Sequence, residues 1–207
     1  MKMKKGQQEA LSAVLISGIL IGVVGSVYFW GVPLIQKNKD ISLLETSESF
    51  MRQLDENVRS VANNGGRNSI VVPIPGIVTF DGEVIKLTIE TQGTIYAPDA
   101  EIPLGKNTLG SLSQSGGNYY GVWGVDEPVL FNVKSIKMGE DTYRNEYTLD
   151  YLELRNSRSL RDFKIDLTGS GTSGGEDNTI VIESQGNTET AADGRTLVSS
   201  NVRITVV

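Results

Sequence analysis

The hydrophobic and polar positions divide the chain into three stretches with different patterns. The first stretch, 10–35, contains 26 residues without a charge. As a helix rising about 1.5 Å per residue it would be about 39 Å long, more than the roughly 30 Å hydrocarbon core of a bilayer. The run is longer than the apolar core of a cleaved secretory signal, and no small-residue cleavage site follows it. We therefore expect a retained helix that can span a membrane.

The second stretch, 36–64, has an amphipathic pattern. Apolar residues recur at steps of three and four along one face, while acidic and basic residues occupy the other. The apolar positions are Leu44, Met51, Leu54, Val58 and Val61, widened by Ile41 and Phe50. This pattern predicts a helical segment with one packing face. The face meets either a sister helix or the chain's own β-sheet, and we favour the sheet.

Beyond Gly66 apolar and polar residues alternate, which is typical of strands. The expected strands are 69–72, 77–80, 84–90, 119–125, 129–138, 146–155, 160–167, 179–183 and 195–207, with 94–97 as an extension of the sheet. Asp81-Gly82 predicts a hairpin turn. Loops are expected at 98–118, 168–178 and 186–194, which are rich in turn-forming residues. The expected fold class is α+β: a long N-terminal hydrophobic helix followed by a mostly antiparallel β-sandwich-like domain, residues 65–207.

Composition narrows the function classes. The chain carries 19 Lys and Arg against 25 Asp and Glu, a net charge of −6. Such an acidic chain is a poor partner for nucleic acid, which is bound through basic side chains. His and Cys are absent, which removes the commonest metal ligands, the His-containing triads and any disulfide. We therefore expect a protein that is not an enzyme and that has no catalytic residues, no cofactor and no metal.

Two glycine-rich or acidic segments are weak candidates for ligand sites. The tract Gly169–Gly175 lacks the Gly-Lys-Ser/Thr ending of a phosphate-binding loop and does not open a helix, so we interpret it as a loop. The acidic pairs Glu140-Asp141 and Glu176-Asp177 lack the spaced ligands of a calcium loop. Solvated turns are the expected role of both pairs.

Two further groups of side chains are candidates for a catalytic or binding role because of their residue types. Asp150 and Glu153 are a carboxylate pair, but glycoside hydrolysis needs two acids facing one cleft. Tyr119, Tyr120 and Trp123 form either an exposed platform for a carbohydrate or surface, or part of the sheet core. We favour the core.

Charges at the N-terminus set the expected orientation of the first helix. Lys2, Lys4 and Lys5 precede the apolar run. By the positive-inside tendency this end stays in the cytoplasm, and residues after about 36 lie outside.

The junction between these lysines and the apolar run resembles a known type of signal peptide. Lys4, Lys5, Gly6 and Gln7, followed by the uncharged helix, resemble the class III signal peptide of archaeal type IV pilin-like proteins. The resemblance implies that a prepilin peptidase removes the leader, residues 1–6, between Gly6 and Gln7. It further implies that the helix, 7–64, is retained, with 10–35 first spanning the membrane and then forming the core of a filament.

The resemblance also suggests residues for subunit assembly. Glu9 stands two residues after Gln7, whereas family members commonly have a Glu four residues after. It either pairs with the terminal amine of a neighbouring subunit or reaches the cytoplasmic headgroups. Gly18 and Gly22 form a small-xxx-small pair that lets membrane helices approach closely, or reflect the general frequency of glycine in such helices. Pro33 predicts a kink or a break.

These expectations combine into one functional hypothesis with an alternative. The chain is expected to be a subunit, major or minor, of an archaeal type IV pilus-like filament. It would move from the cell membrane to the cell surface, and its partners would be copies of itself or other pilins. The alternative is a single-pass, membrane-tethered extracellular binding module or adhesin that does not polymerise.

Overall fold

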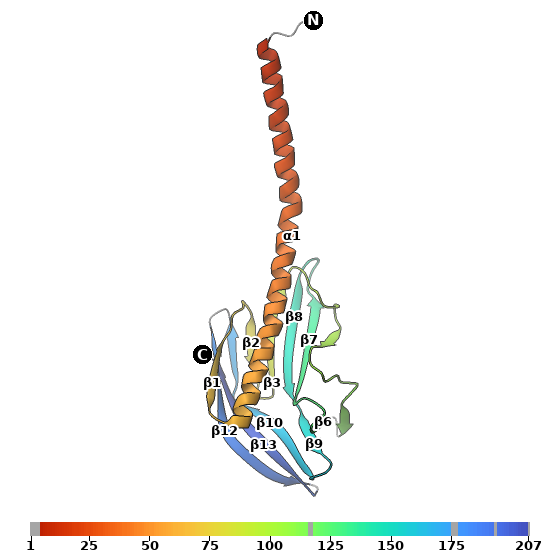
Figure 1. Cartoon of the computed structure of the whole chain (residues 1–207), viewed down its shortest axis with the longest axis vertical. Coiled ribbons are helices and arrows are strands. Elements are labelled where there is room, and N and C mark those ends of the chain that lie inside the picture. The colour runs from red at the N-terminus through yellow and green to blue at the C-terminus, as the bar shows by residue number, and fades with distance from the viewer. Residues whose placement is uncertain (1–4, 116–117, 175–177, 193, 207) are drawn as a thin grey trace. The chain divides into compact units, whose positions relative to one another are not determined.

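The computed structural model describes residues 5–115, 118–174, 178–192 and 194–206. The chain divides into two compact units, 1–40 and 41–207. A single helix, α1 (Lys5–Asn64), supplies nearly all of the first unit and the opening segment of the second. In the described residues after this helix, the regular elements are all strands (Figure 1).

The helix continues through Pro33 without a break. The sequence pattern predicted a kink or a break there, and the break is wrong. Proline has a fixed φ near −65°, which is compatible with a helix, and it removes only one backbone hydrogen bond. The uncharged residues on both sides continue the helical hydrogen bonds, so the loss of hydrogen bonding stays local to Pro33.

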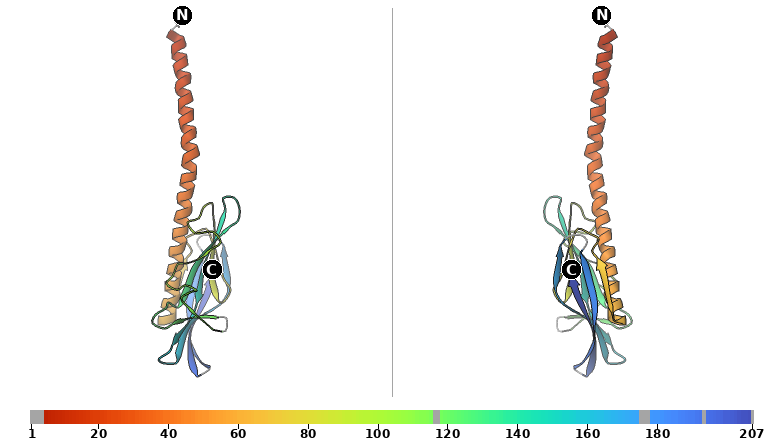
Figure 2. Two further views of the ribbon diagram at one scale, coloured as in Figure 1. Left: turned by 90° about the vertical axis from the view of Figure 1, so that its right-hand side faces the viewer. Right: turned by 90° about the vertical axis from the view of Figure 1, so that its left-hand side faces the viewer.

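The second half of α1 packs on the chain's own sheets, as the amphipathic pattern predicted. Its apolar stripe forms one buried cluster with side chains from both sheets. The helical members of that cluster are Leu44, Phe50, Met51, Leu54, Val58, Val61 and Ala62. Figures 1 and 2 show residues 41–64 lying along the strands. The β-domain core is therefore incomplete without this part of the helix.

The strands form two sheets that are mostly antiparallel. The seven-stranded sheet has the order β1-β12-β13-β10-β9-β6-β5, and the six-stranded sheet has the order β11-β2-β3-β8-β7-β4. The strands of the first sheet are β1 (Arg67–Val71), β5 (Ser113–Ser115), β6 (Asn118–Val122), β9 (Glu153–Asn156), β10 (Arg161–Thr168), β12 (Thr179–Ala192) and β13 (Arg195–Val206). Those of the second are β2 (Ile77–Phe80), β3 (Val84–Thr91), β4 (Glu101–Pro103), β7 (Val129–Lys137), β8 (Tyr143–Tyr151) and β11 (Gly171–Gly174). Parallel pairing occurs between β10 and β13 and between β6 and β9.

Alternation along the central strands separates the core face from the solvent face. Ile85, Leu87 and Ile89 of β3 are buried in the core cluster. On the opposite face Lys86 pairs with Glu146 of β8 at 3.7 Å. The expected hairpin at Asp81-Gly82 joins β2 to β3, with Gly82 at φ +104° and the Asp81 carboxylate accepting the amide of Val84 at 3.0 Å.

Several segments expected to be loops are strands. Gly171–Gly174 forms β11 and pairs with β2, although it carries no large apolar side chain. Residues 186–192 extend β12 alongside β13 in a long hairpin, and the region 98–118 contains β4 and β5. Backbone ladders stabilise these polar strands because neighbouring strands already fix their pairing partners. The converse error is 94–97, which is not a strand.

Candidate functional site

The apolar part of α1 is the most unusual surface of the first unit. Within the described residues, the helical segment from Leu11 contains an 18-residue window with a mean hydropathy of 2.1, none of it buried. By length and composition this helix can cross a membrane, and a signal sequence has the same properties. Its large apolar side chains from Leu11 to Ile35 are exposed, with Phe29 at 83% and Trp30 at 85%.

The glycines of this helix have no packing role within the described part of the chain. A Cβ atom built on Gly18, Gly22, Gly25 or Gly31 would meet no heavy atom within 4 Å, apart from the helix's own neighbouring backbone. Ser26 donates its hydroxyl to the carbonyl of Gly22 at 2.8 Å, so that polar group is satisfied within the helix. Nothing in the described part of the chain therefore requires small residues at these four positions.

The residues proposed for leader processing lie at the start of the helix. Lys4 falls outside the described residues, and α1 begins at Lys5. Gly6, Gln7 and Glu9 follow within its first turns, where only the backbone is described. The cleavage site and the pairing of Glu9 stay predictions.

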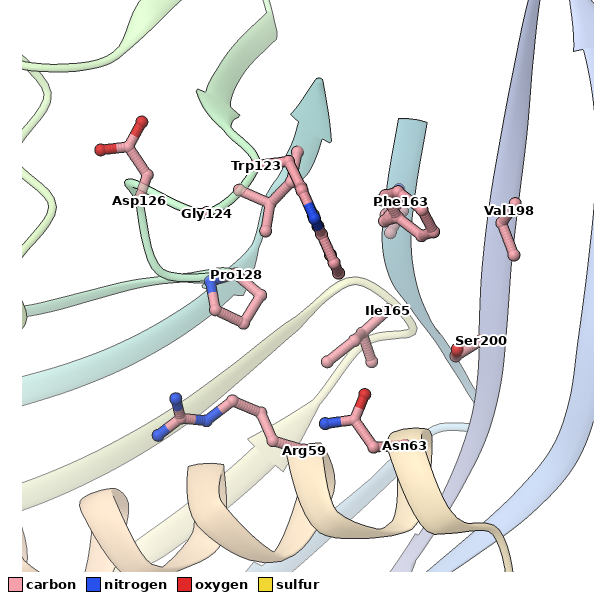
Figure 3. A pocket seen from close by; sticks show the side chains of 12 residues that line it. Arg59, Asn63, Trp123, Gly124, Asp126, Pro128, Phe163, Ile165, Val198 and Ser200 are labelled. Carbon is pink, nitrogen blue, oxygen red and sulfur yellow. The ribbon is translucent and has the colours of Figure 1, made fainter. Parts of the chain in front are cut away.

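A second candidate site is a cleft of about 410 Å³ in the β-domain. Arg59 and Asn63, one helical turn apart near the end of α1, line one side. Trp123, which directly follows β6, lines another, and its indole stacks on Phe163 of β10 with ring centroids 4.0 Å apart. Figure 3 shows the indole between Phe163 on one side and Pro128 and Arg59 on the other.

The charges beside this cleft are nearly balanced. Arg59 pairs with Asp55 through Nη2 and Oδ2 at 2.8 Å. Tyr151 donates its hydroxyl to Oδ1 of the same carboxylate at 3.0 Å. Burial raises the pKa of Asp55, although Arg59 and the Tyr151 hydrogen bond oppose the shift. Of the side-chain polar atoms in the described residues, Arg59 Nε is one of two that are buried without a hydrogen-bond partner.

A larger polar groove of about 690 Å³ contains both carboxylates of the pair noted in the sequence, Asp150 and Glu153. Burial raises the pKa of Asp150. Glu153 is held by Arg155, with Nε to Oε1 at 2.7 Å, and that guanidinium also lies 3.8 Å from the ring centroid of Tyr120. Because Arg155 neutralises Glu153, the pair does not offer two free carboxylates for glycoside hydrolysis.

The expectation that Tyr119, Tyr120 and Trp123 pack in the sheet core is wrong. Trp123 is 48% exposed, and the two tyrosines are half-buried on the lining of the polar groove. The reason is position, because β6 lies next to the edge strand β5 and Trp123 falls beyond its end. These three side chains therefore face the two cavities instead of the core.

Sequence reasoning missed the residues that complete the cleft. Asn63 and Arg59 lie on the polar side of the amphipathic pattern, and Phe163 falls within the expected strand 160–167. The spacing of four between Arg59 and Asn63, which gives them a shared helical face, was the available signal.

No metal centre accompanies either cavity in the residues that the structure describes, since no three His, Cys, Asp or Glu side chains are grouped to hold an ion. Comparison with known proteins finds no matching protein family, curated protein or solved structure.

Proposed function

We propose that the chain is a structural subunit of an archaeal type IV pilus-like surface filament, assembled through its N-terminal helix after leader cleavage. One observation supports this most strongly. A single continuous helix completes the core of the β-domain with its second half and exposes apolar side chains and unpacked glycines along its first half. The first half lacks a partner within the described part of the chain.

Exposure of that first half to water would be very unfavourable. Burying one large apolar side chain contributes about 1.5–3 kcal/mol, so the exposed side chains from Leu11 to Ile35 together represent tens of kcal/mol. A membrane covers these apolar side chains before assembly, and a bundle of neighbouring helices covers them afterwards. The proposed route therefore moves the helix from lipid into a filament core without exposing it to water.

The proposed roles of the N-terminal residues follow from this route. A prepilin peptidase recognises Lys4, Lys5, Gly6 and Gln7 and cuts after Gly6. Glu9 then lies near the new amine and is available to pair with that of a neighbouring subunit. The β-domain forms the outer surface, and we assign it no catalytic role.

A second candidate function is a tethered binding module or adhesin that does not polymerise. The cleft at Trp123 favours it, because a half-exposed indole beside unpaired polar groups is typical of a ligand site. The two functions are compatible in one chain, and experiments can distinguish them.

Mass spectrometry of membrane-extracted protein tests the processing step. We expect a mature N-terminus at Gln7, and a Gly6→Phe variant should retain its leader. Electron microscopy of sheared cell surfaces should show filaments that contain the chain and that disappear in the Gly6→Phe strain. An intact N-terminus in the native protein, or filaments built from uncut protein, would refute the proposal.

The glycines allow a matched test of the assembly face. Gly18 and Gly22 share one side of the helix, whereas Gly31 lies nine residues, or about 180°, beyond Gly22. Gly22→Leu should block close helix approach and abolish filaments, while Gly31→Leu adds the same side chain to the opposite side. Membrane insertion should be equal in both. Filaments that tolerate Gly22→Leu but not Gly31→Leu would show that the Gly18 and Gly22 face is not the contact.

A further inference from the structure

We propose that the cleft beside Trp123 binds a pyranose-type saccharide, a role that goes beyond filament assembly. The cleft holds about 410 Å³, within the usual range of roughly 300–1,000 Å³ for small-molecule sites. It is built from parts of the chain far apart in sequence: the end of α1, the segment after β6, and β10 and β13.

The first requirement that the cleft places on a ligand is a flat apolar face. The Trp123 indole is kept in position by Phe163, with ring planes 30° apart and centroids at 4.0 Å. Phe163 covers one face of the ring, and the other face looks across the cleft toward Pro128 and Arg59, with Ile165 below the ring in the view of Figure 3. The C–H face of a pyranose matches such an indole wall, since aromatic rings carry a negative face that attracts polarised hydrogens.

The second requirement that the cleft places on a ligand is an edge whose groups both donate and accept hydrogen bonds. The Asn63 amide points into the cleft in Figure 3, and no other side chain or backbone group of the described residues bonds it. Ser200 adds a hydroxyl, and Arg59 adds guanidinium donors beside the one that Asp55 occupies. An amide and a hydroxyl each donate and accept, as vicinal sugar hydroxyls do.

Other ligand classes fit less well. An anion would use only donors, while Asp55 already neutralises Arg59 at 2.8 Å and the chain has a net charge of −6. A purely apolar ligand would remove water from Asn63 and Arg59 without replacing those hydrogen bonds, which is costly. A hydroxyl-rich ring with one apolar face satisfies both halves of the lining.

The test uses the full-length chain in a sugar-free zwitterionic detergent, with Trp30→Phe so that Trp123 is the only tryptophan. The probes are D-glucose, D-galactose, D-mannose and N-acetyl-D-glucosamine. A ligand of about a dozen non-hydrogen atoms is expected to bind with a millimolar dissociation constant, so titration extends to about 50 mM. Saturation-transfer NMR and Trp123 fluorescence measure binding.

At least one probe should give a saturable response. Trp123→Ala should abolish the NMR signal, and Asn63→Leu, on the exposed end of the helix, should weaken binding about tenfold by removing hydrogen bonds. Tyr120→Phe, in the polar groove, is the matched control and should bind as the parent does. Silence toward all four probes would overturn the proposal, as would an unchanged response in folded Trp123→Ala protein. Filament formation by the same variants is a separate measurement, so failure here leaves assembly untouched.

Discussion

One buried hydroxyl that contributes to the attachment of α1 to the β-domain can be removed without changing the shape of the core. Tyr147 of β8 is fully buried, and its hydroxyl donates to the carbonyl of Leu44 on the helix at 3.0 Å. The same oxygen lies 3.1 Å from the hydroxyl of Tyr96. Either hydroxyl could be the donor in that second contact, and Tyr96 also donates to Glu48 Oε2 at 3.5 Å.

Tyr147→Phe removes both contacts but leaves the ring in place. The Leu44 carbonyl keeps its position in the helix ladder, and Tyr96 can turn toward Glu48, 3.5 Å away. Because both freed groups retain a partner, the expected loss is about 1–1.5 kcal/mol, the usual net contribution of a hydrogen bond, instead of the larger cost of an unsatisfied group. For a domain of this size this corresponds to a fall of about 2–6 °C in the unfolding midpoint.

Urea unfolding of the full-length protein in micelles, followed by near-UV circular dichroism, measures the change. Tyr143→Phe on the same strand is the control, since its hydroxyl has no hydrogen bond within the described residues, and its effect should stay within about 0.5 kcal/mol. Equal stability of the two variants would refute the reasoning, because it would mean that the Tyr147 hydroxyl contributes nothing to the attachment of the helix. A loss above about 3 kcal/mol would also refute it, since a freed polar group would then have stayed unpaired.

Two further substitutions test the fold at single positions. Gly169→Ala should destabilise the protein by more than about 2 kcal/mol, because the residue has φ +108° and a Cβ would lie 2.3 Å from the carbonyl oxygen of Ile204. The control is Gly174→Ala, which has open space around it and should be nearly neutral in the same urea titration. Asp55→Asn should change how stability depends on pH. Burial raises the pKa of Asp55 above 3.8, so its contribution is greatest below that value and is lost as pH rises through the folded-state pKa. The parent should therefore lose stability relative to the variant as the pH rises above 3.8, and parallel curves would contradict the assignment.

Features with a strong local signal could be predicted from the sequence. The stripe from Leu44 to Val61 is periodic, and it packs where an amphipathic helix must pack. The turn at Asp81-Gly82 is equally local, because the Asp carboxylate and the positive φ of the glycine lie within three residues of each other. In both cases the information needed lies within a few turns or residues.

Features that depend on distant partners could not be predicted. Strand β11 has no apolar residue to mark it, and its pairing with β2 joins residues about 90 positions apart. The cleft has the same origin, since Trp123 and Phe163 meet only after β6 and β10 take their places in one sheet. Periodicity describes one face of one element, whereas such a site is formed by several elements.

The two halves of α1 also differ in the surroundings that each requires. From Leu44 to Val61 only one stripe is apolar, so packing against the strands on one side of the helix satisfies it. From Leu11 to Ile35 apolar side chains are exposed all round the helix, and a helix of that kind must be surrounded on every side. One docking partner would cover a single side and leave the rest in water, so lipid or several neighbouring helices are the environments that fit. Transfer between those two environments gains little from hydrophobicity, because lipid is as apolar as leucine, and close packing at the small residues then decides whether helices associate.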